Sequence, residues 1–73
     1  MLSAVYKVVE LIGTSPESWE KAARVAVETA AETLRDLRVA EIVEQDMHIE
    51  EGKVVAYRVK VKVSLKYERG GED

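Results

Sequence analysis

The chain has 73 residues, a formal net charge of −3 and no cysteine. Its length predicts one small domain, and without disulfides or a cysteine-based zinc site its thin core should be completed by homo-oligomerisation. The mild negative charge argues against nucleic acid as a partner, and the lack of a membrane-length apolar run or a secretory signal predicts a cytoplasmic protein with no membrane partner.

The first predicted element is a strand over residues 2–12, which is rich in β-branched and aromatic side chains and ends at Gly13. The next residues, TSPESW, predict the start of a helix in either of two ways. Ser15 can cap the helix ahead of Pro16, or a capping box can begin one residue earlier, at Thr14. The two interpretations differ only in where the helix begins.

The helix should present one apolar stripe that is mostly alanine, with charged side chains opposite. Alanine lets a helix lie close to a sheet but buries little area, which again favours further burial between subunits. Trp19, in the first turn, is the largest apolar group and is expected to pack against the sheet. The stripe consists of Trp19, Ala22, Ala23, Ala26, Val27, Ala30, Leu34 and Leu37.

Two further strands are predicted at residues 38–49 and 53–67, joined by a tight turn at Glu51 and Gly52. The last strand alternates between an apolar face and a basic face, which is typical of a strand buried on one side. We call the basic face the basic row; it comprises Arg58, Lys60, Lys62, Ser64 and Lys66.

A two-residue turn fixes which residues of the two strands lie opposite each other. It pairs Glu50 with Lys53, Glu41 with Lys62 and Gln45 with Arg58. In this register Glu44 and Asp46 lie on the apolar face, beyond Ala40 and Ile42, which the helix should cover. The two carboxylates are therefore expected at an uncovered margin of the sheet, where a neighbouring subunit packs.

The element order predicts an α+β fold, β-α-β-β, with a three-stranded antiparallel sheet curled around one helix. A right-handed crossover makes the first two strands parallel, so the third strand fits between them, in the order 1-3-2. Residues 1–67 should form the single domain. Residues 68–73, ERGGED, are expected to be a disordered tail.

Three segments, VYKVVELIGTSPESW, TLRDLRVAEIVEQ and AYRVKVKVSLKY, closely resemble the dodecin family over nearly the whole chain. The resemblance implies a hollow, cubic-symmetry homododecamer that stores or sequesters small ligands, usually flavins. The chain has no catalytic motif: there is no cysteine, no suitably spaced histidine and carboxylate, and no glycine-rich phosphate loop. We therefore expect a binding protein rather than an enzyme.

The positions that resemble the flavin pocket of the family have changed. The resemblance places the flavin-stacking tryptophan at Val39 and the flavin-bonding glutamine at Arg58, and Gln45 is predicted to lie beside Arg58. Losing an aromatic stack costs about 0.5–1.5 kcal/mol beyond the lost area. Tight flavin binding should be lost or much weakened.

The segment RVAEIVEQDM resembles the calcium dodecin branch of the family, which implies calcium as the ligand. Glu44 and Asp46 are the candidate metal ligands, with interface salt bridges or solvation as the alternative. Glu41 and Lys62 are expected to pair across the strands or at an interface. Three functions remain open: a calcium-binding storage shell, a flavin-binding shell with a modified pocket, and a purely structural assembly.

Overall fold

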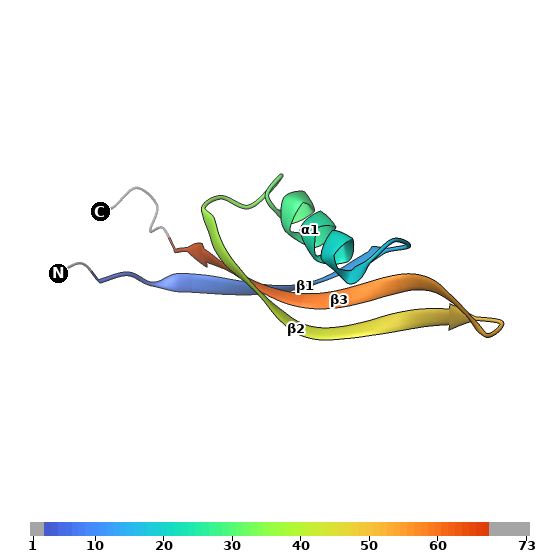
Figure 1. The fold of residues 1–73 in the computed structure, drawn as a ribbon. Coiled ribbons are helices and arrows are strands. Elements are labelled where there is room, and N and C mark those ends of the chain that lie inside the picture. Colours follow the sequence, from blue (N-terminus) through green and yellow to red (C-terminus); the bar gives the residue numbers. More distant parts are fainter. Residues whose placement is uncertain (1–2, 68–73) are drawn as a thin grey trace.

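A computed structural model describes residues 3–67, which form a three-stranded sheet with one helix lying on it (Figure 1). Along the chain the elements are β1 (Tyr6–Ser15), α1 (Trp19–Ala30), β2 (Leu37–Glu50) and β3 (Lys53–Lys66). β3 lies between β1 and β2 and is antiparallel to both. The predicted β-α-β-β fold and strand order are confirmed. The tail predicted to be disordered, residues 68–73, lies outside the described residues.

β1 does not end at Gly13, contrary to the sequence prediction, but continues to Ser15. Gly13 is buried opposite Val59 in the sheet. A Cβ atom at this position would collide with the backbone oxygen of Ala22 and with the Cβ of Ala26. Glycine is therefore required because α1 approaches the strand here, and not because the strand ends.

Both predicted helix starts were wrong, because β1 is still paired at Ser15 and the helix begins only at Trp19. Ser18 is the N-cap: its Oγ accepts a hydrogen bond from the backbone N–H of Lys21 at 3.0 Å. The buried Ser15 instead uses its Oγ to accept the N–H of Glu17, also at 3.0 Å, which closes the turn between strand and helix.

The helix is also shorter than its apolar stripe suggested. It ends at Ala30, whose carbonyl oxygen accepts the N–H groups of both Thr33 and Leu34 in a closing turn. Asp36, with a positive φ of 59°, then redirects the chain into β2. Leu37 therefore reaches the core from the first position of β2 and not from the helix.

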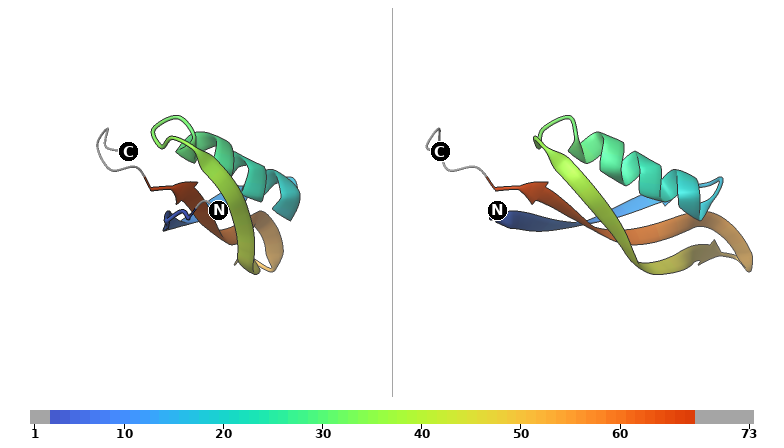
Figure 2. Two further views of the ribbon diagram at one scale, coloured as in Figure 1. Left: turned by 90° about the vertical axis from the view of Figure 1, so that its left-hand side faces the viewer. Right: turned by 60° about the vertical axis from the view of Figure 1, so that its left-hand side comes forward.

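α1 lies over β1 and β3 and barely touches β2 (Figure 2). The buried apolar core is accordingly small and consists of Ala22, Ala26, Ala30, Val59, Val61 and Val63. The prediction that the helix covers Ala40 and Ile42 was wrong, since Ala40 is exposed and Ile42 is 51% exposed. The far half of the β2–β3 hairpin extends beyond the helix as an arm.

The chain is elongated, with dimensions of 54 × 22 × 14 Å and a radius of gyration of 15.2 Å. A compact domain of this length has a radius of gyration of about 11 Å.

Among residues 3–67, no helix is both long and apolar enough to cross a membrane.

Candidate functional site on the outer face of the sheet

The β2–β3 hairpin closes with the two-residue turn that the sequence predicted. Glu51 and Gly52 have φ values of 50° and 75°, as a tight hairpin of this kind requires. Glu50 lies opposite Lys53, and Glu41 lies opposite Lys62 further along the ladder. The predicted register is therefore confirmed at both of these points.

Between these points the register is shifted by one residue. Val55 is an extra residue on β3, between the pairs of Ile49 with Val54 and His48 with Ala56. Val43 is an extra residue on β2 and restores the original register. Two β-bulges therefore enclose a segment in which every residue has moved by one position.

A one-residue shift sends each side chain to the opposite face of a sheet. Asp46 lies opposite Arg58 and Glu44 opposite Lys60, whereas Gln45 lies opposite the buried Val59. The prediction that Gln45 pairs with Arg58 was wrong, and so was the placement of Glu44 and Asp46 on the apolar face.

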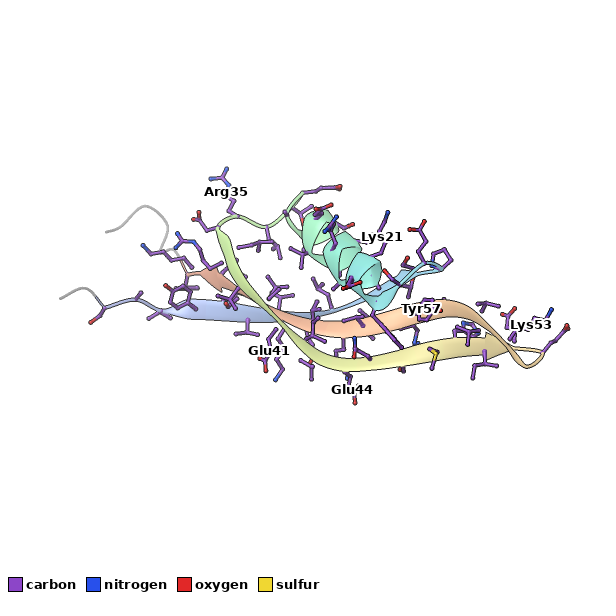
Figure 3. All side chains as sticks on the ribbon, viewed as in Figure 1. Lys21, Arg35, Glu41, Glu44, Lys53 and Tyr57 are labelled. Carbon is purple, nitrogen blue, oxygen red and sulfur yellow. The ribbon has the colours of Figure 1, made fainter. Side chains whose placement is uncertain are left out.

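The two carboxylates instead join the basic row on the outer face, which is the side of the sheet away from α1. Figure 3 shows Glu41 and Glu44 pointing away from the helix. Glu44 and Asp46 line a shallow hollow of about 130 Å³, which we call the outer hollow. Its five lining residues are Ile12, Glu44, Asp46, Arg58 and Lys60.

Each acidic side chain of the outer hollow contacts a basic one. Arg58 donates two parallel hydrogen bonds to Asp46, from Nε to Oδ1 at 2.7 Å and from Nη2 to Oδ2 at 2.8 Å. Lys60 Nζ lies 3.5 Å from Glu44 Oε1, a looser ion pair. The bidentate geometry makes the Arg58–Asp46 pair the better defined of the two.

The ion pair also changes the acid–base behaviour of both partners. The hydrogen bonds from Arg58 lower the pKa of Asp46 below its ordinary value. Desolvation opposes this shift, and the positive charges of Arg58 and Lys60 add to it. The hydrogen bond to Asp46 raises the pKa of Arg58. Both groups therefore remain charged near neutral pH.

The backbone of Asp46 is held from the helix side. The indole N–H of Trp19 donates to the Asp46 carbonyl oxygen at 3.0 Å. The same indole packs edge to face against Tyr57, with ring centroids 5.0 Å apart and an interplanar angle of 71°. The expected packing role of Trp19 is confirmed, and its contacts fix the position of the shifted segment.

The outer hollow contains two carboxylates, which are too few to complete a calcium site within the chain. Glu44 and Asp46 offer four hard oxygen atoms, whereas calcium takes six to eight. Within residues 3–67, no group of three or more His, Cys, Asp or Glu side chains is placed to hold a metal ion. His48 lies 3.5 Å from Glu50, beyond the hollow toward the hairpin turn.

The positions expected to form a flavin pocket do not meet within the chain. Val39 lies opposite Ser64 and is 62% exposed, on the same outer face as Arg58. The two positions are six residues apart along β3, which is about 20 Å. Gln45, on the other face, is separated from both.

Comparisons with known proteins place the chain in one family. The dodecin family model matches residues 5–68. Calcium dodecin of Mycobacterium tuberculosis is 49% identical over 63 residues, which covers 86% of this chain and 89% of that protein. Dodecin of Thermus thermophilus is 40% identical over 67 residues, covering 92% and 97%.

Solved structures of dodecins are also similar to this chain. Dodecin of Streptomyces coelicolor superposes with a TM-score of 0.89 at 36% identity, covering 96% of this chain and all of the other. The crystal structure of the M. tuberculosis protein, described as a calcium-chelating antigen with a novel calcium-binding site, gives a TM-score of 0.80 at 48% identity, covering 96% and 99%. The chain therefore belongs to the dodecin family.

Proposed function

We propose that this dodecin is a non-enzymatic, cytoplasmic protein that assembles into a homododecameric shell and binds calcium at junctions between subunits. Glu44 and Asp46 are the proposed ligands. The observation that carries the proposal is the paired bulge, which brings both carboxylates to the same outward-facing hollow. The 49% identity to a protein named calcium dodecin supports the choice of metal.

Self-assembly is supported by the apolar surface that one subunit leaves uncovered. A groove between α1 and β2 is lined mainly by Ala23, Val27, Ala40, Ile42 and Val61. On the hairpin arm, Met47, Ile49 and Val54 are each more than two-fifths exposed. Neighbouring subunits that cover these surfaces compensate for the small core.

Calcium placement at a junction follows from the ligand count. The two carboxylates of one subunit leave at least two positions unfilled, which water, backbone carbonyls or a carboxylate of a symmetry-related subunit can supply. Calcium bound in this way is stored or buffered without chemical change. A storage role is consistent with a chain that carries no catalytic motif.

Native mass spectrometry and calcium-binding calorimetry test the proposal. The freshly purified protein should have a twelve-subunit mass that includes calcium, and chelator should remove the calcium. Glu44→Gln and Asp46→Asn should each weaken calcium binding, whereas Glu20→Gln, on exposed helix surface, should not. A dodecamer whose calcium binding is unaffected by the first two substitutions would exclude the proposed ligands.

A flavin-binding shell is the second candidate, supported by the position of Val39 and Arg58 on one face. Because these residues are distant within a subunit, a shared pocket would combine them from different subunits. Titration of riboflavin with the protein should then quench flavin fluorescence. An assembly that retains neither flavin nor calcium would leave the third candidate, a purely structural role.

A further inference from the structure

Both carboxylate oxygens of Asp46 are already occupied in the subunit. Arg58 Nε and Nη2 contact Oδ1 and Oδ2 at 2.7 and 2.8 Å, and these are the two oxygens that a metal ion would use. Glu44 is less restrained, with a single contact to Lys60 at 3.5 Å. A calcium ion that binds Asp46 therefore shares these two oxygens with Arg58, which already uses one acceptor site on each of them.

The Arg58–Asp46 pair is held in place by its surroundings. Arg58 lies on the central strand, opposite Thr14 on one side and Asp46 on the other. The Asp46 backbone is fixed by the indole of Trp19. Because the backbones of both partners are positioned before the pair forms, little additional ordering is needed to form it, and it competes well with an incoming ion.

The charges of the outer hollow sum to zero: Glu44 and Asp46 contribute −2, and Arg58 and Lys60 contribute +2. A neutral hollow gives a divalent cation little net attraction. Removing the charge of Arg58 changes the sum to −1 and frees both oxygens of Asp46. Arg58 therefore opposes calcium binding both by its charge and by occupying the ligand atoms.

We propose that Arg58 is an internal counterion that competes with calcium for Asp46 and thereby sets the calcium affinity of the assembly. This inference rests on the proposed function, because it takes Asp46 as a calcium ligand. In this role Arg58 lowers the calcium affinity of the site, so that calcium is released again when its concentration falls.

Calcium-binding calorimetry on the intact assembly tests this role with three variants. Arg58→Gln should bind calcium roughly tenfold more tightly than the wild type, since one positive charge near a divalent ion is removed. Arg58→Lys keeps the charge but cannot form the bidentate hydrogen bonds. Its calcium affinity should therefore lie between those of the wild type and Arg58→Gln. Arg35→Gln is the matched control for net charge; Figure 3 shows Arg35 pointing away from the sheet.

The double variant Arg58→Gln with Asp46→Asn should lose the gain in affinity, because the oxygens freed by the first substitution are removed by the second. Native mass spectrometry of each variant establishes that the assembly is intact. Equal or weaker calcium binding by Arg58→Gln in an intact assembly, with calcium binding by the wild type still dependent on Asp46, would overturn the role of Arg58 alone. If calcium binds neither the wild type nor Arg58→Gln, or binds independently of Asp46, the proposed function itself fails.

Discussion

The indole N–H of Trp19 donates to the backbone carbonyl oxygen of Asp46 at 3.0 Å, and the carboxylate of the same aspartate is held by Arg58. One residue of β2 is thus fixed from both faces of the sheet: from α1 through its backbone and from the basic row through its side chain. This double attachment lies within the segment that the two bulges shift, and it stabilises that segment in its shifted register.

Replacing Trp19 with phenylalanine should destabilise the protein by about 1 kcal/mol, because the hydrogen bond to Asp46 is lost while an aromatic ring still packs near Tyr57. Denaturant unfolding followed by circular dichroism, at one fixed protein concentration, measures the change. Tyr67→Phe, at a half-exposed aromatic ring, is the control. Equal midpoints for Trp19→Phe and the wild type would mean that the indole bond contributes no stability.

Gly13→Ala should destabilise the protein by about 3 kcal/mol, because the new Cβ would meet backbone and side-chain atoms of α1 that cannot easily move. Gly52→Ala is the matched control. It has no atom within 4 Å of the new Cβ and carries only the cost of its positive φ, about 1 kcal/mol. Thermal unfolding of both variants provides the comparison, and a control equally destabilised would exclude the close helix approach as the cause.

The contribution of Asp46 to stability should depend on pH. Its pKa in the folded protein is lowered by Arg58 relative to the ordinary value of 3.8, so its stabilising effect is present above that value and is lost as the pH falls through the lower folded pKa. Asp46→Asn should therefore unfold at a lower urea concentration than the wild type at neutral pH. The difference should disappear in strong acid.

A titration of Asp46 in two proteins separates this effect from a general response to acid. An NMR titration of the Asp46 carboxyl carbon should give a pKa below 3.8 in the wild type and a higher value in Arg58→Gln. A wild-type pKa that Arg58→Gln leaves unchanged would contradict the assignment of the shift to the ion pair.

The groove between α1 and β2 supplies a test of assembly. Ile42 is 51% exposed in the subunit, so Ile42→Lys should cost little in an isolated chain but should disrupt a shell in which a neighbour covers the groove. Size-exclusion chromatography with light scattering should show smaller species for Ile42→Lys, and Ile42→Val should assemble normally. An intact shell for Ile42→Lys would remove this groove from the subunit interface.

The sequence by itself determined the element order, the central position of β3 and the hairpin turn. The elements and the turn follow from local signals: an alternating strand, a helical stripe, and a two-residue turn ending in glycine. The central position of β3 follows from the right-handed crossover, which makes β1 and β2 parallel. The helix boundaries did not follow, because TSPESW offers several serine and threonine caps, and only the continued pairing of Ser15 with Tyr57 selects Ser18.

Only the tertiary structure decided where Glu44 and Asp46 point. A weak signal of the bulges is present in the sequence: Ile42-Val43 and Val54-Val55 are adjacent apolar pairs that interrupt the alternation of each strand. Such a pair does not reveal which residue is extra, since an unpaired residue is recognised only by the partners of its neighbours on the other strand. Because side chains alternate between the two faces of a strand, the position of one extra residue decides which face every residue up to the next bulge occupies. Here it places Glu44 and Asp46 beside the basic row and not on the apolar face.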